Sequence, residues 1–200
     1  MKLLVLAANG QVARIVIQRI LAEPAFADVQ LTLELRNHER LAELATNDRV
    51  TVAEVDLEDA ASVAAVMAGQ DMVYIGVVDH DDNNAITKNV VAAMKAAGVS
   101  RLISTSLLGL YNEVPGEFGR WNSERVGGAM AGAIKADQLL ENSGVTYTTL
   151  RLPWLNDRDE VKYVLTHRHD QYIGVSGSRQ SVADVVLRIV ADPTFGRMIV

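Results

Sequence analysis

A glycine turn near the N-terminus has the residue types that hold a phosphate group. Gly10 lies in the run 7–13 (AANGQVA), between a short apolar stretch and a segment with helical spacing. Because glycine has no side chain, the backbone can approach a pyrophosphate, and free N–H groups at the start of a helix attract an anion. The spacing resembles the dinucleotide-binding turn G-x-x-G-x-x-[GA], in which Ala13 keeps the helix close to the sheet.

Ala7 departs from this pattern, which has glycine at the first position. A left-handed backbone there would cost alanine roughly 1–2 kcal/mol because of its Cβ atom. We expect the turn to be unstrained at Ala7. The alternative is a strained turn that binds the cofactor more weakly.

The end of the second apolar stretch indicates which dinucleotide binds. Arg36 stands where sites for NAD usually place an acidic residue. A guanidinium can hold a 2′-phosphate with two hydrogen bonds, so the sequence predicts NADP(H), with NAD(H) left open. The alternative is a solvated surface arginine. Glu34 lies inside the stretch, where alternation along a strand predicts that it points to the opposite face.

Two further loops are expected to line the same cofactor. Asp56 and Leu57 follow the third β-rich run, where a carboxylate can accept from the adenine amino group and a leucine can pack on the ring. Asp56 also suits the N-cap of the next helix, and both roles stay open. Gly76 and Val77 lie at the end of the fourth run and are expected to pass under the ribose.

Hydroxyl groups near the fifth run are the candidate catalytic groups. Ser104 and Ser106 lie where the carboxyl end of a strand would face a nicotinamide or a substrate carbonyl. Local hydrogen bonding to the backbone is the alternative for both. Tyr111 is the third candidate. Glycine and proline between the aromatic residues of 111–125 predict a loop rather than a helix.

These loops require a scaffold in which β-rich runs alternate with alanine-rich segments. The expected strands are 2–7, 29–35, 50–55, 71–78, 99–106 and 145–151, with a seventh at the terminal RMIV. The expected helices are 11–23, 38–46, 56–68, 83–97, the second half of 123–143, and 180–191, while 152–180 is irregular. Such alternation implies parallel βαβ units, so we expect one α/β domain over 1–200 with a doubly wound parallel sheet of six to seven strands.

Composition and charge exclude several classes of protein. The chain of 200 residues has no cysteine, which excludes disulfides, thiolate metal sites and a cysteine nucleophile and fits a reducing cytoplasm. The formal net charge is −6 and no basic face is visible, so we expect neither nucleic acid nor a membrane surface as a partner. The polar run 79–84 lacks the spacing of a calcium loop and suits a helix start, so we expect no metal site.

These loops together resemble the atypical short-chain dehydrogenase/reductases, in the branch of NmrA-like and NADH-flavin reductase-like NAD(P)H-binding proteins. The resemblance runs from residue 1 to about 195. It is carried by AANGQVAR at 7–14, Arg36, VDLED at 55–59, the serines with Gly109 and Tyr111, SGVTYTTLRLPWL at 143–155 and SRQSVADVV at 178–186. It implies a Rossmann-like domain with a small C-terminal substrate lobe, to which 107–122 and 152–180 are assigned.

The resemblance also implies roles for further residues. It places Gly10, Gln11 and Val12 along the pyrophosphate, with Ala8 and Asn9 of the same turn among the cofactor-binding residues. It places Pro153, Trp154 and Leu155 at the pocket beside the nicotinamide.

One departure from the wider superfamily bears on the activity. Ordinary members use a Tyr-x-x-x-Lys pair, in which lysine lowers the pKa of the tyrosine so that it can donate a proton. The residues four positions after the five tyrosines are Val78, Pro115, Arg151, His167 and Ser176, so the sequence has no such pair. The cofactor carries the chemistry of hydride transfer, and an electrophilic acceptor needs less from the protein.

We therefore predict an NADPH-dependent reductase that passes hydride to a small electron-poor acceptor such as a flavin or a quinone. Tyr111, Trp121 and Trp154 are the expected walls of its pocket. The first alternative is an NADP(H)-binding redox sensor without turnover, and the second is a relic that binds nothing tightly. A homodimer is left open.

Overall fold

Seven parallel strands form one sheet in the order β3-β2-β1-β4-β5-β6-β9. The computed structural model describes residues 1–192, 194 and 198–199. The strands are β1 (Lys2–Leu6), β2 (Gln30–Leu35), β3 (Val50–Glu54), β4 (Met72–Val78), β5 (Arg101–Leu107), β6 (Thr146–Leu152) and β9 (Met198–Ile199). The predicted α/β class with a doubly wound sheet is confirmed, because the strand order reverses between β1 and β4. Of the strand expected at RMIV, Arg197 and Val200 lie outside the described residues.

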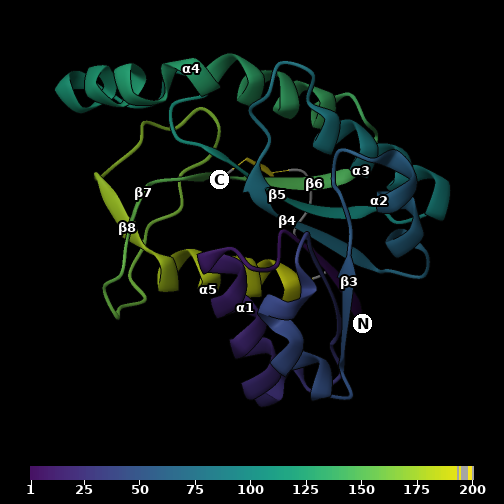
Figure 1. Cartoon of the computed structure of the whole chain (residues 1–200). Coiled ribbons are helices and arrows are strands. Elements are labelled where there is room, and N and C mark those ends of the chain that lie inside the picture. The colour runs from purple at the N-terminus through teal and green to yellow at the C-terminus, as the bar shows by residue number, and fades with distance from the viewer. Residues whose placement is uncertain (193, 195–197, 200) are drawn as a thin grey trace.

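Helices cover both faces of this sheet (Figure 1). On one face α1 (Gln11–Ala22) and α5 (Arg179–Ala191) contact each other. On the other face α3 (Ala85–Ala97) contacts both α2 (Ala60–Met67) and α4 (Gly116–Glu141). The 3-10 helices η1 (Pro24–Phe26) and η2 (His38–Thr46) precede and follow β2. Among the described residues, no helix is long and apolar enough to cross a membrane.

The central strand β1 supplies both hydrophobic cores. Leu3 and Val5 belong to the core that includes α1 and α5, whereas Leu4 and Leu6 belong to the core with α2 and α3. All four side chains are fully buried. A strand buried on both faces is a nearly continuous apolar run in sequence, which explains why the N-terminal residues predict it. The turn after β1 therefore opens at the middle of the carboxyl edge of the sheet.

The prediction of a loop over 111–125 holds as far as Pro115 and is wrong beyond it, because α4 begins at Gly116. Pro115 is the N-cap residue, where a missing N–H costs little, and Gly116 takes a φ of +67°. A Cβ atom on Gly119 would overlap the carbonyl oxygen of Val114, and one on Gly132 would overlap that of His80. These glycines permit close approach of backbones to α4 rather than breaking the helix.

Three other segments differ from the expected ones in kind or by more than two residues. The helix expected from residue 56 begins at Ala60, because Asp59 is the N-cap and accepts from the N–H of Ala61. The segment 38–46 is a 3-10 helix with a kink at Leu41. The region 152–180, expected to be irregular, contains a two-stranded parallel sheet of β7 (Trp154–Asn156) and β8 (Ser176–Ser178). With the chain between them, these strands form a lobe beyond β6 (Figure 1).

Candidate functional site

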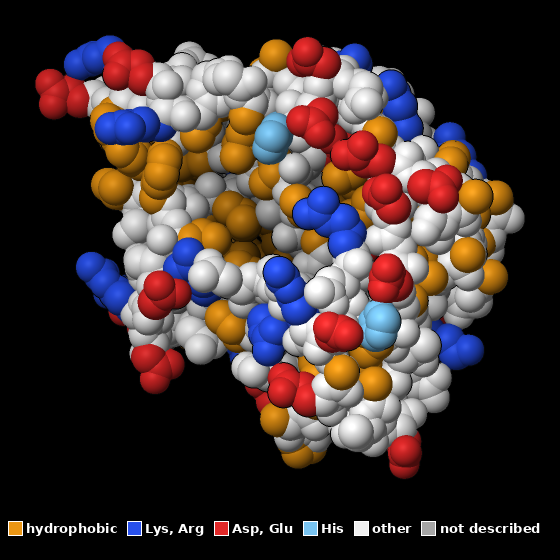
Figure 2. All heavy atoms as spheres, in the orientation of Figure 1, with side chains coloured by type: hydrophobic (Ala, Val, Ile, Leu, Met, Phe, Trp, Pro, Cys, Tyr) orange, Lys and Arg blue, Asp and Glu red, His pale blue; other side chains and the backbone are white. Residues whose placement is uncertain are grey.

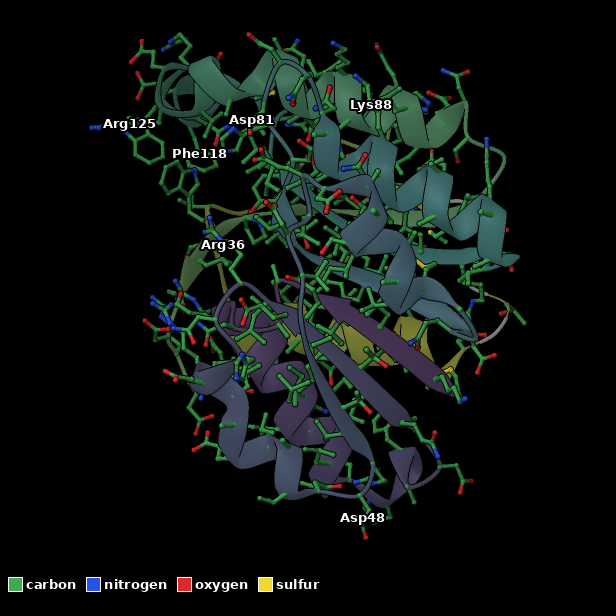
Figure 3. The ribbon with its side chains drawn as sticks, turned by 45° about the vertical axis from the view of Figure 1, so that its right-hand side comes forward. Arg36, Asp48, Asp81, Lys88, Phe118 and Arg125 are labelled. Carbon is green, nitrogen blue, oxygen red and sulfur yellow. The ribbon has the colours of Figure 1, made fainter. Side chains whose placement is uncertain are left out.

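A groove of about 620 Å³ lies at the carboxyl edge of the sheet, where the strand order reverses. The predicted cofactor-binding residues that line it are Asn9, Gly10, Arg36, Asp56, Leu57, Gly76 and Val77. Figure 3 shows Arg36 at this edge, whereas Asp48, which precedes β3, lies at the opposite edge. The loops after four neighbouring strands thus meet in one site, as expected for an open parallel sheet.

The turn after β1 is shaped for contact through its backbone. Gly10 precedes α1, and no side chain caps the N-terminus of this helix. A Cβ atom on Gly10 would lie 3.3 Å from the carbonyl oxygen of Ala7 and 3.4 Å from that of Gly76. One on Gly76 would lie 3.4 Å from the Cβ of Ala13, which confirms that Ala13 lets α1 approach the sheet. A helix start with no capping side chain and a glycine floor fits an anionic pyrophosphate.

The turn is strained at Ala7, and the expectation of an unstrained turn is wrong. Ala7 has a φ of +56°, in the left-handed region. Its carbonyl accepts from the N–H of Gly10 at 3.0 Å, and its own N–H donates to the carboxylate of Glu34 at 2.8 Å. These hydrogen bonds hold the alanine in a conformation that glycine would adopt more readily.

Glu34 is a site residue that sequence reasoning excluded. It lies outside the core that Leu33 and Leu35 join, as alternation predicts, yet its side chain lines the groove. Only 1% of its surface is exposed. Burial raises the pKa of Glu34 to about 7, although the hydrogen bond from Ala7 and the charge of Arg36 lower it. The signal in the sequence that could have indicated this role is a lone acidic residue inside an apolar strand.

Arg36 and Asp56 lie at the expected adenine side of the groove. Among the described residues, the guanidinium of Arg36 forms no hydrogen bond and no ion pair, although its charge acts on Glu34, and the residue is exposed. Asp56 does not cap α2, since its carboxylate accepts from the N–H of Glu58 in the preceding turn. The alternative of Asp56 as the helix cap is therefore wrong. Leu57 lines the groove beside it.

Three predicted residues of the first turn lie beside the groove rather than in its lining. Ala8 is fully buried, and its N–H donates to the backbone carbonyl of Glu34. Val12 belongs to the core under α1, and Gln11 is exposed in the first turn of that helix. Asn37, Arg40 and Glu58 line the groove although the sequence analysis did not assign them.

The candidate catalytic serines lie under α4. Ser104 and Ser106 line a space of about 10 Å³ together with Asp137 and Thr149. The hydroxyl of Thr149 donates to one carboxylate oxygen of Asp137 at 2.8 Å. Ser106 is buried and Ser104 is partly exposed.

Tyr111 is held within the same group of side chains. Its hydroxyl donates to the second carboxylate oxygen of Asp137, and Arg168 donates to the Tyr111 oxygen at 3.1 Å. The guanidinium of Arg168 also lies 4.4 Å from the ring centroid. Burial and the Asp137 carboxylate raise the pKa of Tyr111 well above its usual range. This is the opposite of the effect that a Tyr-x-x-x-Lys pair has.

A second cavity, of about 490 Å³, lies beyond β6 between the lobe and α5. Pro153 lines it, whereas Trp154 and Leu155 do not. Leu155 packs on the core of the α1 and α5 face. The indole N–H of Trp154 donates to Asn122 at 2.9 Å, and its ring centroid lies 4.7 Å from that of Trp121.

A buried ion pair joins the end of β6 to the loop after β5. The guanidinium of Arg151 lies 2.8 Å from the carboxylate of Glu113, and their side chains are 2% and 3% exposed. The same carboxylate accepts from the N–H groups of Gly109 and Tyr111, both at 2.9 Å. Arg151 also donates to the carbonyl of His167 in the lobe. No sequence motif pairs these residues, because they come from separate segments.

Comparisons with known proteins agree with this geometry. The family model described as NAD(P)H-binding matches residues 7–193. Among curated proteins, the chain is 24% identical to Quinone oxidoreductase 2 of Escherichia coli (strain K12) over 200 residues. The alignment covers 92% of this chain and 62% of the relative, so the chain spans less than two thirds of that relative's length.

Two solved structures share the fold over nearly the whole chain. One is a short-chain dehydrogenase/reductase from Veillonella parvula DSM 2008 in complex with NADP. It is 26% identical, with a TM-score of 0.90, 99% of this chain covered and 92% of that chain. The other is a Rossmann-fold NAD(P)-binding family protein from Shigella flexneri. It is 30% identical, with a TM-score of 0.75, 99% of this chain covered and 91% of that chain.

Proposed function

We propose that this chain, which belongs to the NAD(P)H-binding family, is an NADPH-dependent reductase of a small electron-poor acceptor such as a quinone or a flavin. The observation that carries the choice of NADPH is Arg36, an exposed residue on the groove whose guanidinium forms no hydrogen bond or ion pair among the described residues. The likeness to a quinone oxidoreductase at 24% identity supports the class of acceptor. When bound, NADPH supplies a hydride, and the acceptor takes up that hydride and one proton from solvent.

The lining of the groove gives the proposed direction of the cofactor. Arg36, Asp56 and Leu57 follow β2 and β3, so they would hold the adenosine half. Gly10 follows β1 and would hold the pyrophosphate. The nicotinamide half would then extend along the carboxyl edge of the sheet toward β5 and β6. Neighbouring strands are only about 4.8 Å apart, so a dinucleotide lying along this edge spans several of them.

On this side of the sheet, Ser104 and Ser106 remain our candidate catalytic residues. Both belong to β5, and Pro153 follows β6. We assign Tyr111 a positioning role, because its raised pKa and its bond to Asp137 keep the proton on its hydroxyl. Solvent is therefore the proton source in this proposal, in line with an acceptor that is already electrophilic.

The first test is a calorimetric titration with NADPH and with NADH. We expect NADPH to bind more tightly, and Arg36→Ala to weaken NADPH by about 1.5–3 kcal/mol while leaving NADH nearly unchanged. Arg120→Ala, at an exposed position of α4, is the matched control. Equal binding of both nucleotides would contradict the role of Arg36, and no binding would overturn the proposal.

The second measurement is NADPH oxidation in the presence of menadione, riboflavin or flavin mononucleotide. We expect turnover above the background without protein. Tight NADPH binding without reduction of any acceptor would instead favour the redox-sensor alternative.

A further inference from the structure

The second cavity is lined largely by apolar side chains. Its lower walls include Leu150 and Leu152 of β6 and Val182 and Val185 of α5. The hydroxyl-bearing rings of Tyr163 and Tyr172 line it as well. Its volume of about 490 Å³ lies within the range of small-molecule sites, and apolar walls with a few polar groups are typical of them.

Exposed apolar side chains gather around this cavity. Apart from Met1, every exposed large hydrophobic residue of the described chain lies in α4 or in the lobe. They are Trp121, Trp154, Val161, Val164, Ile173 and Val175. Val164 and Ile173 line the cavity and are 76% and 73% exposed. Figure 2 shows hydrophobic side chains gathered beside a hollow on this face. Apolar surface of this kind around a cavity marks a binding site.

The aromatic residues lie close to one another beside the same cavity. The ring centroid of Trp121 is 5.8 Å from that of Phe118, which in turn lies 6.4 Å from Tyr172 on the cavity wall. Figure 3 shows Phe118 and Arg125 at the end of α4 that projects over this side. A flat ring entering the cavity would therefore pass aromatic faces on which it can stack.

The cavity carries one positive charge that has no internal partner. Arg151 is paired with Glu113, and Arg158 lies 3.6 Å from Glu160. Lys162 also lines the cavity, and within the described residues its ammonium forms neither a hydrogen bond nor an ion pair. Lys162 is an exposed residue, so its ammonium is accessible to a ligand in the cavity. It favours an anionic group on the ligand.

We propose that this cavity is the acceptor subsite, and that it takes a flat ring system with an anionic side group. The ring would lie on the apolar walls and the anion at Lys162. This inference rests on the proposed function, because Leu108 and Pro153 place the cavity at the ends of β5 and β6, where the nicotinamide half would extend. The ring gains the hydride and a solvent proton while NADPH becomes NADP⁺, and the anionic group is unchanged.

The test compares two flavins that share one ring system and differ in a phosphate. Flavin mononucleotide and riboflavin are each titrated without NADPH, and binding is followed by quenching of Trp121 and Trp154, the only two tryptophans. We expect the mononucleotide to bind about tenfold more tightly, as a charge-assisted contact would give. Lys162→Ala should remove this preference, and Lys162→Glu should reverse it. Lys95→Ala, exposed in the last turn of α3, is the matched control.

Each titration is repeated with saturating NADP⁺, which keeps the flavin out of the cofactor groove. Quenching that NADP⁺ abolishes, equal affinity for both flavins, absence of flavin binding, or a preference that Lys162 does not affect would each overturn the subsite. Quinone reduction without flavin binding would leave the reductase standing and remove this subsite. Lys162-dependent binding without any turnover would support the subsite and remove the reductase.

Discussion

The cofactor groove and the lobe cavity open at the same edge of the sheet but are built from different kinds of contact. In the groove several contacts are local, such as Gly10 with Ala7 and Asp56 with Glu58, although Ala7 also donates to Glu34. In the lobe they join distant segments, as Glu113 does with Arg151. The groove therefore depends on the geometry of turns after strands, whereas the cavity depends on side chains that only folding brings together.

The two regions also use charge differently. The groove exposes Arg36 without a partner and buries the carboxylate of Glu34. At the lobe, Asp157 pairs with Arg179 of α5, and Arg168 pairs with Glu141 of α4. Charges left free are available to a ligand, whereas removing one partner of a buried pair such as Arg151 and Glu113 leaves an uncompensated charge.

The largest expected effect is a loss of stability from a change near the lobe that leaves cofactor binding in the groove unchanged. Glu113→Gln leaves the buried guanidinium of Arg151 without its counter-ion, so we expect the free energy of unfolding to fall by about 3–5 kcal/mol. NADPH affinity of the folded protein should stay nearly unchanged, because Glu113 does not line the groove. Urea unfolding and calorimetry measure the two quantities.

The control for this variant is an exposed pair of the same kind. Glu117 lies 3.7 Å from Arg120, and their side chains are 95% and 71% exposed. Glu117→Gln should change stability by less than about 1 kcal/mol. A similar small loss for Glu113→Gln would show that the buried pair does not hold the lobe.

The next effect concerns the buried carboxylate of the groove. The pKa of Glu34 is about 7 in the folded protein, above its ordinary value of 4.5. The folded state therefore holds this proton more tightly than the unfolded state, and stability is lost as pH rises from 4.5 through 7. The loss is at most about 3 kcal/mol.

Glu34→Gln should lack this loss, so the variant gains stability relative to the natural protein as pH rises. Urea unfolding at about pH 5 and about pH 8 measures the difference. Glu39→Gln, at an exposed position of η2, is the control. Parallel pH profiles for the natural protein and Glu34→Gln would contradict the assignment.

The smallest effect tests strain in the phosphate turn. Ala7 has a φ of +56°, so Ala7→Gly should raise the free energy of unfolding by roughly 1 kcal/mol. Ala8→Gly is the control, because Ala8 is fully buried and has no positive φ, and it should destabilise the protein. Thermal unfolding of the natural protein and the two variants measures these changes in stability. A loss of stability in Ala7→Gly would show that the turn is not strained.

The sequence predicted the residues of the groove better than those of the lobe, because the groove residues are identified by their positions near the ends of strands. Arg36 directly follows β2, Gly76 lies near the end of β4, and Gly10 belongs to the turn after β1. The end of a parallel strand has a known place in the sheet. The sequence did not predict the start of α4, because Gly119 allows close packing against Val114 rather than forming a loop. The number of glycines in a segment does not distinguish these two roles.

By itself, the sequence determined the alternation of strands and helices and the glycine turn that follows the first strand. These features depend on residue type and spacing within one segment. Only the tertiary structure decided that Glu34 enters the groove, that Ala7 is strained, and that Arg151 pairs with Glu113. It also decided the cavity at Lys162, because its walls come from β5, β6, the lobe and α5, whose packing no local pattern specifies.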